Sequence, residues 1–273
     1  MNKLLSSNLN RLMKNKVFWL GMAAVFVISI VSMLSACRNQ VTAENAALEF
    51  HYFNILPIIG VFSGSVLGLF LGTEYSDGTM RNKIIIGHTR LNVYLSSMIM
   101  SVVVSTLITL VCYVGGLVGI PTFGIWNLPF SQIFIYMLIG VLSSAAMAAI
   151  FVAIAMNCSN KAVTSVVMIL LALLLMVAAS VIYNLLNEPK MVSEMFLVNG
   201  QVKTGEPHLN PKYIDGTPRS MLVFLLEFLP TGQAILLANM EMAKPYICLI
   251  YSIILIVIVT AVGFIAYRKK DLK

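Results

Sequence analysis

The chain has 273 residues, of which 59% are hydrophobic and only 11% carry a charge. Ordinary water-soluble domains have about a quarter of their residues charged, so this composition excludes a soluble globular protein and predicts a polytopic membrane protein. In a soluble protein, the formal net charge of +7 would favour a nucleic-acid partner. In a membrane protein, the basic residues instead indicate which side of the bilayer each loop occupies, so no nucleic acid is expected.

Residues 1–16 have the pattern of an amphipathic helix that lies flat in the lipid headgroup region. Apolar residues fall on one helical face, and polar or basic residues fall on the opposite one. A disordered basic tail is the alternative interpretation. The apolar face consists of Leu4, Leu5, Leu9, Leu12 and Met13.

Six apolar stretches follow. A helix rises about 1.5 Å per residue, so roughly 20 residues cross a hydrocarbon core of about 30 Å. Five of the stretches have that length, and the remaining one is close to it. Within the expected bounds, none of them contains Asp, Glu, Lys, Arg or His. The chain is therefore predicted to be a single all-α transmembrane domain. Its spans are expected at residues 17–36, 54–72, 92–119, 133–156, 162–186 and 246–267.

Four glycines repeat at every fourth position along the second span, at Gly60, Gly64, Gly68 and Gly72. In a membrane such a bare ridge lets another helix approach backbone to backbone, so the glycines predict a helix-packing seam. The pattern leaves open whether the neighbouring helix belongs to the same chain or to a second copy. Glycines tolerated by chance are the alternative.

Between the second and third spans lies a polar insert, residues 74–90, which predicts a single short helix over residues 77–87. Asp77 is expected to be its N-cap, and Gly87 is expected to end it in the left-handed conformation that glycine tolerates. Met80 and Ile84 lie one turn apart on one face of this helix. The insert also contains Glu74, Gly78, Thr79, Arg81 and Lys83.

The longest polar segment, residues 187–218, contains four prolines and no apolar period, and it is predicted to be a loop. Residues 221–229 are strongly apolar, but nine helical residues reach only about 14 Å, and Pro230 stops them. We therefore expect a re-entrant or interfacial helix in which Glu227 lies near water. Together, residues 187–244 form a loop and re-entrant segment on one side of the membrane.

Six spans put both termini on the same side of the membrane. That side holds twelve Lys or Arg residues, among them Arg81 and Lys83, whereas the opposite side holds six. Because cytoplasmic loops are enriched in basic residues, both termini and the insert are predicted to be cytoplasmic, and residues 187–244 are predicted to be extracellular.

The sequence contains no phosphate-binding Gly-x-x-x-x-Gly-Lys-Ser/Thr loop, no His-Glu-x-x-His motif and no soluble stretch large enough for a nucleotide-binding domain. The lack of ionisable residues in the spans also argues against an ion-coupled carrier. The three histidines lie in separate loops, so no catalytic or metal site is expected. If this protein moves a cargo, the energy must come from another chain, and the helix over residues 77–87 is the cytoplasmic element shaped to receive it.

Two motifs carry a resemblance to a known family. The pattern Glu74-x-x-x-Gly78-Thr79-x-Arg81 lies between the second and third spans, and the segment Leu229-Pro230-Thr231-Gly232-Gln233 lies before the last span. With the basic N-terminal helix and the six spans, they resemble the permease subunits of ABC-2-type exporters, of the kind found in bacterial bacitracin-resistance and lantibiotic-immunity systems. The resemblance covers essentially the whole chain.

This resemblance implies two permease subunits, identical or paired with a similar chain, in the bacterial cytoplasmic membrane and joined to two cytoplasmic ATPase subunits. ATP and Mg²⁺ would bind to the ATPase subunits, and no cofactor would bind to this chain. The insert would be a coupling helix seated in a groove of the ATPase. The segment with Glu227, Pro230, Gly232 and Gln233 would dip into the outer leaflet.

On this basis, closure of the ATPase pair is expected to pull on Met80 and Ile84, and the flanking spans are expected to carry the movement to a glycine-lined seam between two permeases. Arg81 and Lys83 would pair with acidic groups of the ATPase, and Glu74 would fix the start of the helix. The alternative for these charges is a solvated loop that serves topology only.

Neutral span walls with Ser, Thr and small residues favour an amphipathic cargo, such as an antimicrobial peptide or a hydrophobic drug, over a bare ion. The competing interpretations of the whole chain are a secondary carrier and a membrane scaffold or sensor without transport activity. A Walker-type ATPase encoded in the adjacent reading frame would discriminate between them.

Overall fold

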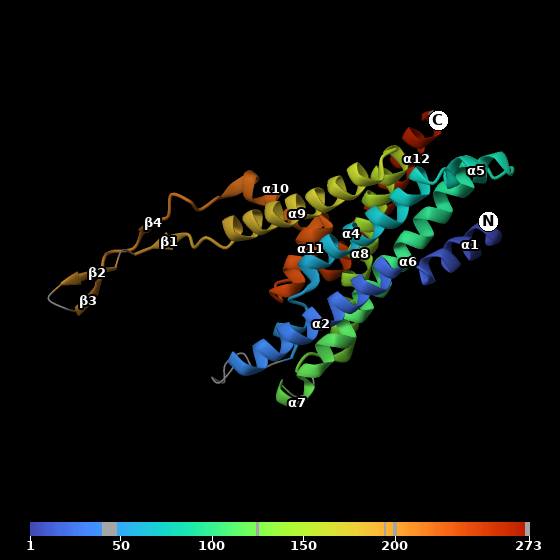
Figure 1. The fold of residues 1–273 in the computed structure, drawn as a ribbon. Coiled ribbons are helices and arrows are strands. Elements are labelled where there is room, and N and C mark those ends of the chain that lie inside the picture. Colours follow the sequence, from blue (N-terminus) through green and yellow to red (C-terminus); the bar gives the residue numbers. More distant parts are fainter. Residues whose placement is uncertain (40–47, 124–125, 194, 199–200, 271–273) are drawn as a thin grey trace.

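The computed structural model describes residues 1–39, 48–123, 126–193, 195–198 and 201–270, and this part of the chain is almost entirely helical. Six of its helices are long and apolar enough to cross a membrane, as the sequence predicts. They are α2 (Lys16–Asn39), α4 (Leu56–Ser76), α6 (Arg90–Gly116), α8 (Phe130–Asn157), α9 (Lys161–Leu186) and α12 (Pro245–Lys269). Figure 1 shows them as a long bundle with both termini at the same end.

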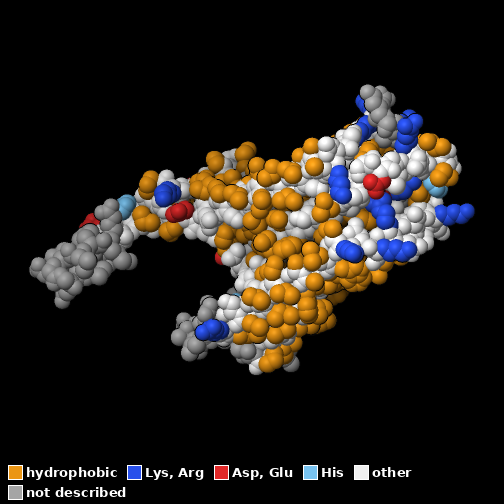
Figure 2. All heavy atoms as spheres, viewed as in Figure 1, with side chains coloured by type: hydrophobic (Ala, Val, Ile, Leu, Met, Phe, Trp, Pro, Cys, Tyr) orange, Lys and Arg blue, Asp and Glu red, His pale blue; other side chains and the backbone are white. Residues whose placement is uncertain are grey.

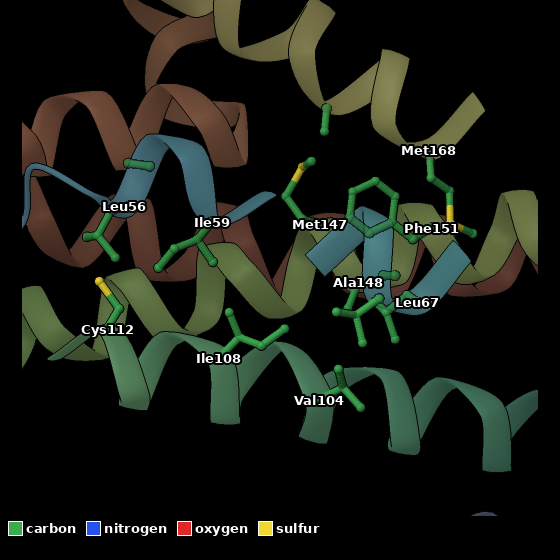
Figure 3. Packing of buried hydrophobic residues seen from close by; sticks show 14 of the residues in the cluster. Leu56, Ile59, Leu67, Val104, Ile108, Cys112, Met147, Ala148, Phe151 and Met168 are labelled. Carbon is green, nitrogen blue, oxygen red and sulfur yellow. The ribbon is translucent and has the colours of Figure 1, made fainter. Parts of the chain in front are cut away.

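Three of these helices form the centre of the bundle. More than half of the most apolar window is buried in α4, in α6 and in α8, but less than a quarter is buried in α2, α9 and α12, which leave large apolar side chains on the outside. Figure 3 shows the inner side chains that meet in this core, among them Leu67 of α4, Val104 of α6 and Ala148 of α8. The exposed faces of the outer helices suit contact with lipid chains.

The glycine ridge of α4 is covered by helices of the same chain, by α9 over most of its length and by α8 at Gly60. A Cβ atom added at Gly68 would stand 2.7 Å from the Cα of Ser165, and one added at Gly72 would stand 3.0 Å from the Cα of Lys161. At Gly60, by contrast, the nearest atom would be the terminal methyl group of Met147, 3.3 Å away. The expectation that this ridge forms the seam between two permease copies is therefore wrong, because a neighbouring helix of the same chain already occupies it.

Substituting Gly68 by Ala is expected to destabilise the bundle by about 1–3 kcal/mol, because the added methyl group would push two helix backbones apart. Gly60→Ala makes the same change on the same face but meets a flexible side chain that can move, so its effect should stay under about 1 kcal/mol. Thermal unfolding of the two variants in detergent tests this. Equal losses of stability would mean that α4 and α9 are not in backbone contact at Gly68.

Short helices join the spans at the end opposite to the termini. They are α3 (Glu49–Tyr52), the 3-10 helix η1 (Leu117–Gly119) and α7 (Ile120–Phe123). The ring of Tyr52 stacks on that of Tyr113 in α6, with ring centroids 5.6 Å apart, and meets the ring of Trp126 edge-on at 4.6 Å. Burial raises the pKa of the Tyr52 hydroxyl well above its ordinary value. These aromatic contacts fasten the first connection of the chain to the bundle.

The polar segment after α9 is not the simple loop that the sequence predicted. Strand β1 (Met191–Val192) pairs antiparallel with β4 (His208–Leu209), and β2 (Met195–Val198) pairs antiparallel with β3 (Gln201–Thr204). The result is a narrow two-stranded ribbon that projects away from the bundle (Figure 1). Antiparallel pairing satisfies the backbone groups of a segment that has no helix to join.

The apolar segment before the last span is a bent pair of helices. Helix α10 (Gly216–Phe228) and helix α11 (Pro230–Ala238) meet at an angle of 92° across Leu229. The prediction of a helix over residues 221–229 that ends at Pro230 is close to the observed α10, but the second half of the pair was not expected. This geometry is that of a broken span or of a re-entrant loop.

Candidate functional site

The insert between the second and third spans lies at the end of the bundle where both termini are found. Its helix is α5 (Thr79–Ile85), and the N-terminal helix α1 (Asn2–Met13) lies near it. Figure 2 shows Lys and Arg side chains gathered at this end, whereas apolar side chains cover the length of the bundle. Helix α5 is therefore a solvent-side element within a basic surface.

Helix α5 begins at Thr79, two residues after the predicted start at residue 77, and its cap differs. Helix α4 continues to Ser76, four residues beyond the expected end of the second span, so Asp77 becomes the C-cap of α4. Gly78 takes the N-cap position of α5 with φ of 67°, a left-handed conformation that few other residues adopt. The expectation that Asp77 caps the short helix is thus wrong. The hydroxyl of Thr79 donates to the carbonyl of Glu74 at 2.8 Å and closes the turn between the two helices.

The other end of α5 is closed by Gly87, as predicted, with φ of 99°. The amide of Gly87 donates to the carbonyl of Ile84 at 3.0 Å, and the amide of His88 donates to the carbonyl of Lys83 at 3.1 Å. These two bonds form a Schellman motif, which satisfies the free carbonyls of a helix end. Both ends of α5 are therefore fixed by glycines, and the helix holds a defined position despite its length.

The face that α5 presents to solvent is not the predicted one. Met80 is only 1% exposed, and the partly buried Ile84 packs against the bundle core. Ile85 and Ile86, in contrast, are 69% and 78% exposed, and the side chain of Arg81 is exposed as well. Met80 and Ile84 therefore anchor α5 to the bundle. The apolar contact that α5 can offer to a partner is made by Ile85 and Ile86.

Glu74 is the centre of an ionic cluster beneath α5. Its side chain has no exposure, and its Oε1 atom lies 2.8 Å from Nη1 of Arg11 and 3.0 Å from Nζ of Lys83. Among the described residues, no hydrogen-bond donor lies on its Oε2 atom. The carboxylate therefore depends on two cations, one from α1 and one from α5, for compensation of its burial.

Two residues of α1 that the sequence analysis did not single out complete this cluster. The Oδ1 atom of Asn8, which is buried, accepts a hydrogen bond from Nζ of Lys83 at 3.0 Å. The guanidinium of Arg11 also donates to the carbonyl of Phe70 at 2.7 Å and lies over the Phe70 ring, 4.4 Å from its centroid. Lys83 is thus used inside the chain, so the expectation that it pairs with acidic groups of a partner is wrong. Arg81 remains exposed for that role.

The segment that follows α5 is tied to the C-terminal end of α12. Arg90 Nη1 donates to the carbonyls of Arg268 and Lys270, at 2.8 and 2.7 Å. The ammonium of Lys270 lies 4.3 Å from the centroid of the Tyr75 ring, and burial lowers the pKa of Lys270. The guanidinium of Arg90 lies at the carbonyl end of α12, where a positive charge interacts favourably with the helix dipole. The insert is therefore held by α1 on one side and by α12 on the other.

The second motif, residues 229–233, holds the bent helix pair together through Gln233. Its Nε2 atom donates to the carbonyl of Glu227 at 2.9 Å and to the carbonyl of Cys248 at 3.1 Å. Its Oε1 atom accepts from the hydroxyl of Ser252 at 2.7 Å. One fully buried amide thus satisfies a carbonyl that the bend leaves without its helical partner, and it joins the bend to α12.

The neighbouring residues of this motif have packing roles. Pro230 begins α11 and needs no amide partner there. The hydroxyl of Thr231 donates to the carbonyl of Leu175 in α9 at 3.1 Å. Gly232 lies against α10, because a Cβ atom placed on it would stand 2.1 Å from the carbonyl oxygen of Leu226. Glu227 is partly exposed, and it lines a cavity of about 150 Å³ together with Tyr183 and Glu241.

Several serine and threonine hydroxyl groups within the spans bond to carbonyls of their own helix. Ser101 donates to Ser97 at 2.8 Å, Thr109 donates to Ser105 at 3.0 Å, and Ser144 donates to Val141 at 2.8 Å. These residues act as small packing residues that allow close helix contact. In the described part of the chain, no three His, Cys, Asp or Glu side chains lie together as ligands for a metal ion.

Comparison of the sequence with models of known protein families and with characterised proteins finds no match. The chain is a multi-pass membrane protein. Six long apolar helices carry that conclusion, and the functional interpretation depends on the geometry of the two segments described above.

Proposed function

We propose that this chain is the permease subunit of an ATP-driven exporter of the ABC-2 type. Two permease subunits, two copies or this chain with a similar one, would assemble with two cytoplasmic ATPase subunits in the bacterial cytoplasmic membrane. ATP and Mg²⁺ would bind to the ATPase subunits. The family resemblance of the two motifs and the six long apolar helices support this proposal.

The single observation that carries the proposal is the exposed isoleucine pair at the end of α5. Ile85 is the last residue of α5 and Ile86 is its C-cap, and both are exposed on a short element that lies between two spans on a basic surface. Adjacent isoleucines this exposed on a solvent-side element favour a protein contact, because such a contact would remove both side chains from water. Arg81 adds a charge that an acidic side chain of a partner can pair with.

The distribution of charges supports the proposed orientation. Both termini, α5 and most of the basic side chains lie at one end of the bundle, and the positive-inside bias assigns such an end to the cytoplasm. The ribbon β1–β4 and the bent pair α10–α11 then lie toward the outside. This orientation gives α5 access to a cytoplasmic ATPase.

A movement of the ATPase would pass through α5 to the transmembrane bundle. Short turns join α5 to α4 and to α6, which form the centre of the bundle with α8, so a displacement of α5 would tilt that centre. Because helices of the same chain cover the glycine ridge of α4, the second permease would contact another face of the bundle. Away from their ends the spans are neutral and apolar, which favours an amphipathic cargo such as an antimicrobial peptide or a hydrophobic drug.

The double variant Ile85→Asp/Ile86→Asp tests the docking role of α5. The wild-type permease, purified in detergent, should retain the ATPase encoded in an adjacent reading frame, and the double variant should bind it at least about thirtyfold more weakly. Burying two carboxylates in an apolar groove is costly, which is the reason for so large an effect. Affinity can be measured by pull-down across a concentration series.

Asn82→Asp is the matched control, because it adds a negative charge at an exposed position of the same helix without removing an apolar side chain. It should retain most of the wild-type affinity. Unchanged binding of the double variant would remove α5 from the mechanism. Wild-type permease that binds no such ATPase would favour a scaffold or sensor without transport.

A further inference from the structure

Helix α1 is bonded to α5 rather than merely adjacent to it. Its buried side chains Leu4, Asn8 and Leu12 recur every fourth residue and face the bundle, and Arg11 lies beside them. Asn8 contacts Lys83 directly, at 3.0 Å, and Arg11 contacts the same Glu74 oxygen that binds Lys83. Two routes, one direct and one through a shared carboxylate, therefore connect α1 to α5.

The exposure of these groups makes the connection firm. Lys83 has a side-chain exposure of 13% and Glu74 has none, so water screens their interaction only weakly. Arg11 is 34% exposed, but it is also fixed by the carbonyl and the ring of Phe70 in α4. The Glu74 carboxylate is thus the common partner of a cation on α1 and a cation on α5, and it belongs to the last turn of α4.

We propose that α1 is a second positioning element for the docking surface of Ile85 and Ile86. The ends of α1, α4 and α5 move as one body around Glu74, so that a force on α5 reaches α1, and the position of α1 in the membrane surface sets the angle at which α5 meets its partner. Arg11 and Asn8 are positioning residues in this unit. The inference concerns the site of the proposed function and, for its effect on the ATPase, rests on that function.

Arg11→Gln tests this unit selectively, because it removes the bond from α1 to Glu74 but leaves the Glu74–Lys83 pair in place. Lys14→Gln is the matched control, since it removes the same charge from the end of the same helix at an exposed position. Arg11→Lys keeps a cation at Glu74 and should rescue the variant in part. Each variant is purified as the full-length chain in detergent.

The first readout is amide hydrogen exchange of the permease alone. The amides of Asn82, Ile86 and His88, which are bonded within the α5 turn, should exchange about tenfold faster in Arg11→Gln than in the wild type or in Lys14→Gln. Exchange in α9 and α12 should not change. A general increase throughout the chain, or no increase in α5, would show that Arg11 has only a global structural role and would overturn the proposal.

The second readout is the concentration of permease that gives half-maximal stimulation of the ATPase. It should rise severalfold in Arg11→Gln, remain unchanged in Lys14→Gln and recover partly in Arg11→Lys. Unchanged stimulation together with faster exchange in α5 would contradict a role of α1 in docking. Failure of the wild type to stimulate any ATPase would refute the proposed function instead, while the exchange result would still decide whether α1 holds α5.

Discussion

Glu74→Gln is expected to lower the free energy of unfolding by about 3 kcal/mol, with a fall in the melting temperature of roughly 6–12 °C. Glutamine keeps the size of the side chain but removes the negative charge, which leaves Arg11 and Lys83 facing the same point as two uncompensated cations. Removing one member of a buried ion pair is among the most destabilising single changes known. Because Arg11 is a third exposed, water would solvate part of its charge in the variant. The fall in melting temperature should therefore lie toward the lower end of the interval given above.

Asp77→Asn is the matched control, three residues further along the chain. Its carboxylate is exposed, and its single described hydrogen bond is with the adjacent hydroxyl of Ser76 at 3.2 Å. The loss of this charge should change the stability by less than about 0.5 kcal/mol. The melting temperatures of both variants, measured in the same detergent, test this prediction. If the two variants had the same melting temperature, the cluster around Glu74 would not contribute to the stability of the fold.

The transmembrane helices could be predicted from the sequence because length and apolarity alone define them. The expected ends mostly fall within a few residues of the observed ones, and the exception is α4, which continues to Ser76. That extension matters, because it places Glu74 in the last turn of a spanning helix. A charge is tolerated there when a partner is present, and the partners come from elsewhere in the chain.

The face of α5 could not be predicted because its apolar pattern allows two answers. Met80 and Ile84 form one pair on the helix surface, whereas Ile85 and Ile86 form another at its C-terminal end. Seven helical residues contain too little periodicity to decide which pair faces the bundle. The tertiary structure decides it, since α1 and α4 lie on one side of α5.

The ionic cluster around Glu74 could not be predicted from the sequence either, because its members come from distant parts of the chain. Asn8 and Arg11 are separated from it by more than sixty residues, and an amphipathic pattern does not indicate which polar residue of a helix turns inward. Asn8 was one polar residue among several on α1, yet it is buried.

The ribbon after α9, in contrast, has a local signal in the sequence. Asn199-Gly200 stands in the sequence between the residues of β2 and those of β3, and Asn-Gly is a strong hairpin signal. The prolines of the surrounding segment suggested a loop, and they obscured this signal. The pairing of β1 with β4 is shifted by one residue from the register of β2 and β3, so the hairpin signal alone does not give it.

The second large effect is expected at the bend between α10 and α11, where Gly232→Ala should lower the free energy of unfolding by about 3 kcal/mol or more. The new methyl group would stand 2.1 Å from the carbonyl oxygen and 3.0 Å from the Cα of Leu226. Both are backbone atoms, so one helix must move. That movement would separate Gln233 from the carbonyls of Glu227 and Cys248, which would then be buried without a donor.

Ala238→Ser is the control for this change, since it adds one heavy atom in the same helix at a partly exposed position. It should leave the melting temperature within about 2 °C of the wild type, whereas Gly232→Ala should unfold at least about 6 °C earlier or fail to elute as a single species in size-exclusion chromatography. A stable Gly232→Ala variant would mean that α10 and α11 do not touch at this point. The hydrogen bonds of the Gln233 amide depend on that contact, so they could not be what holds the 92° bend, and another interaction would have to stabilise it.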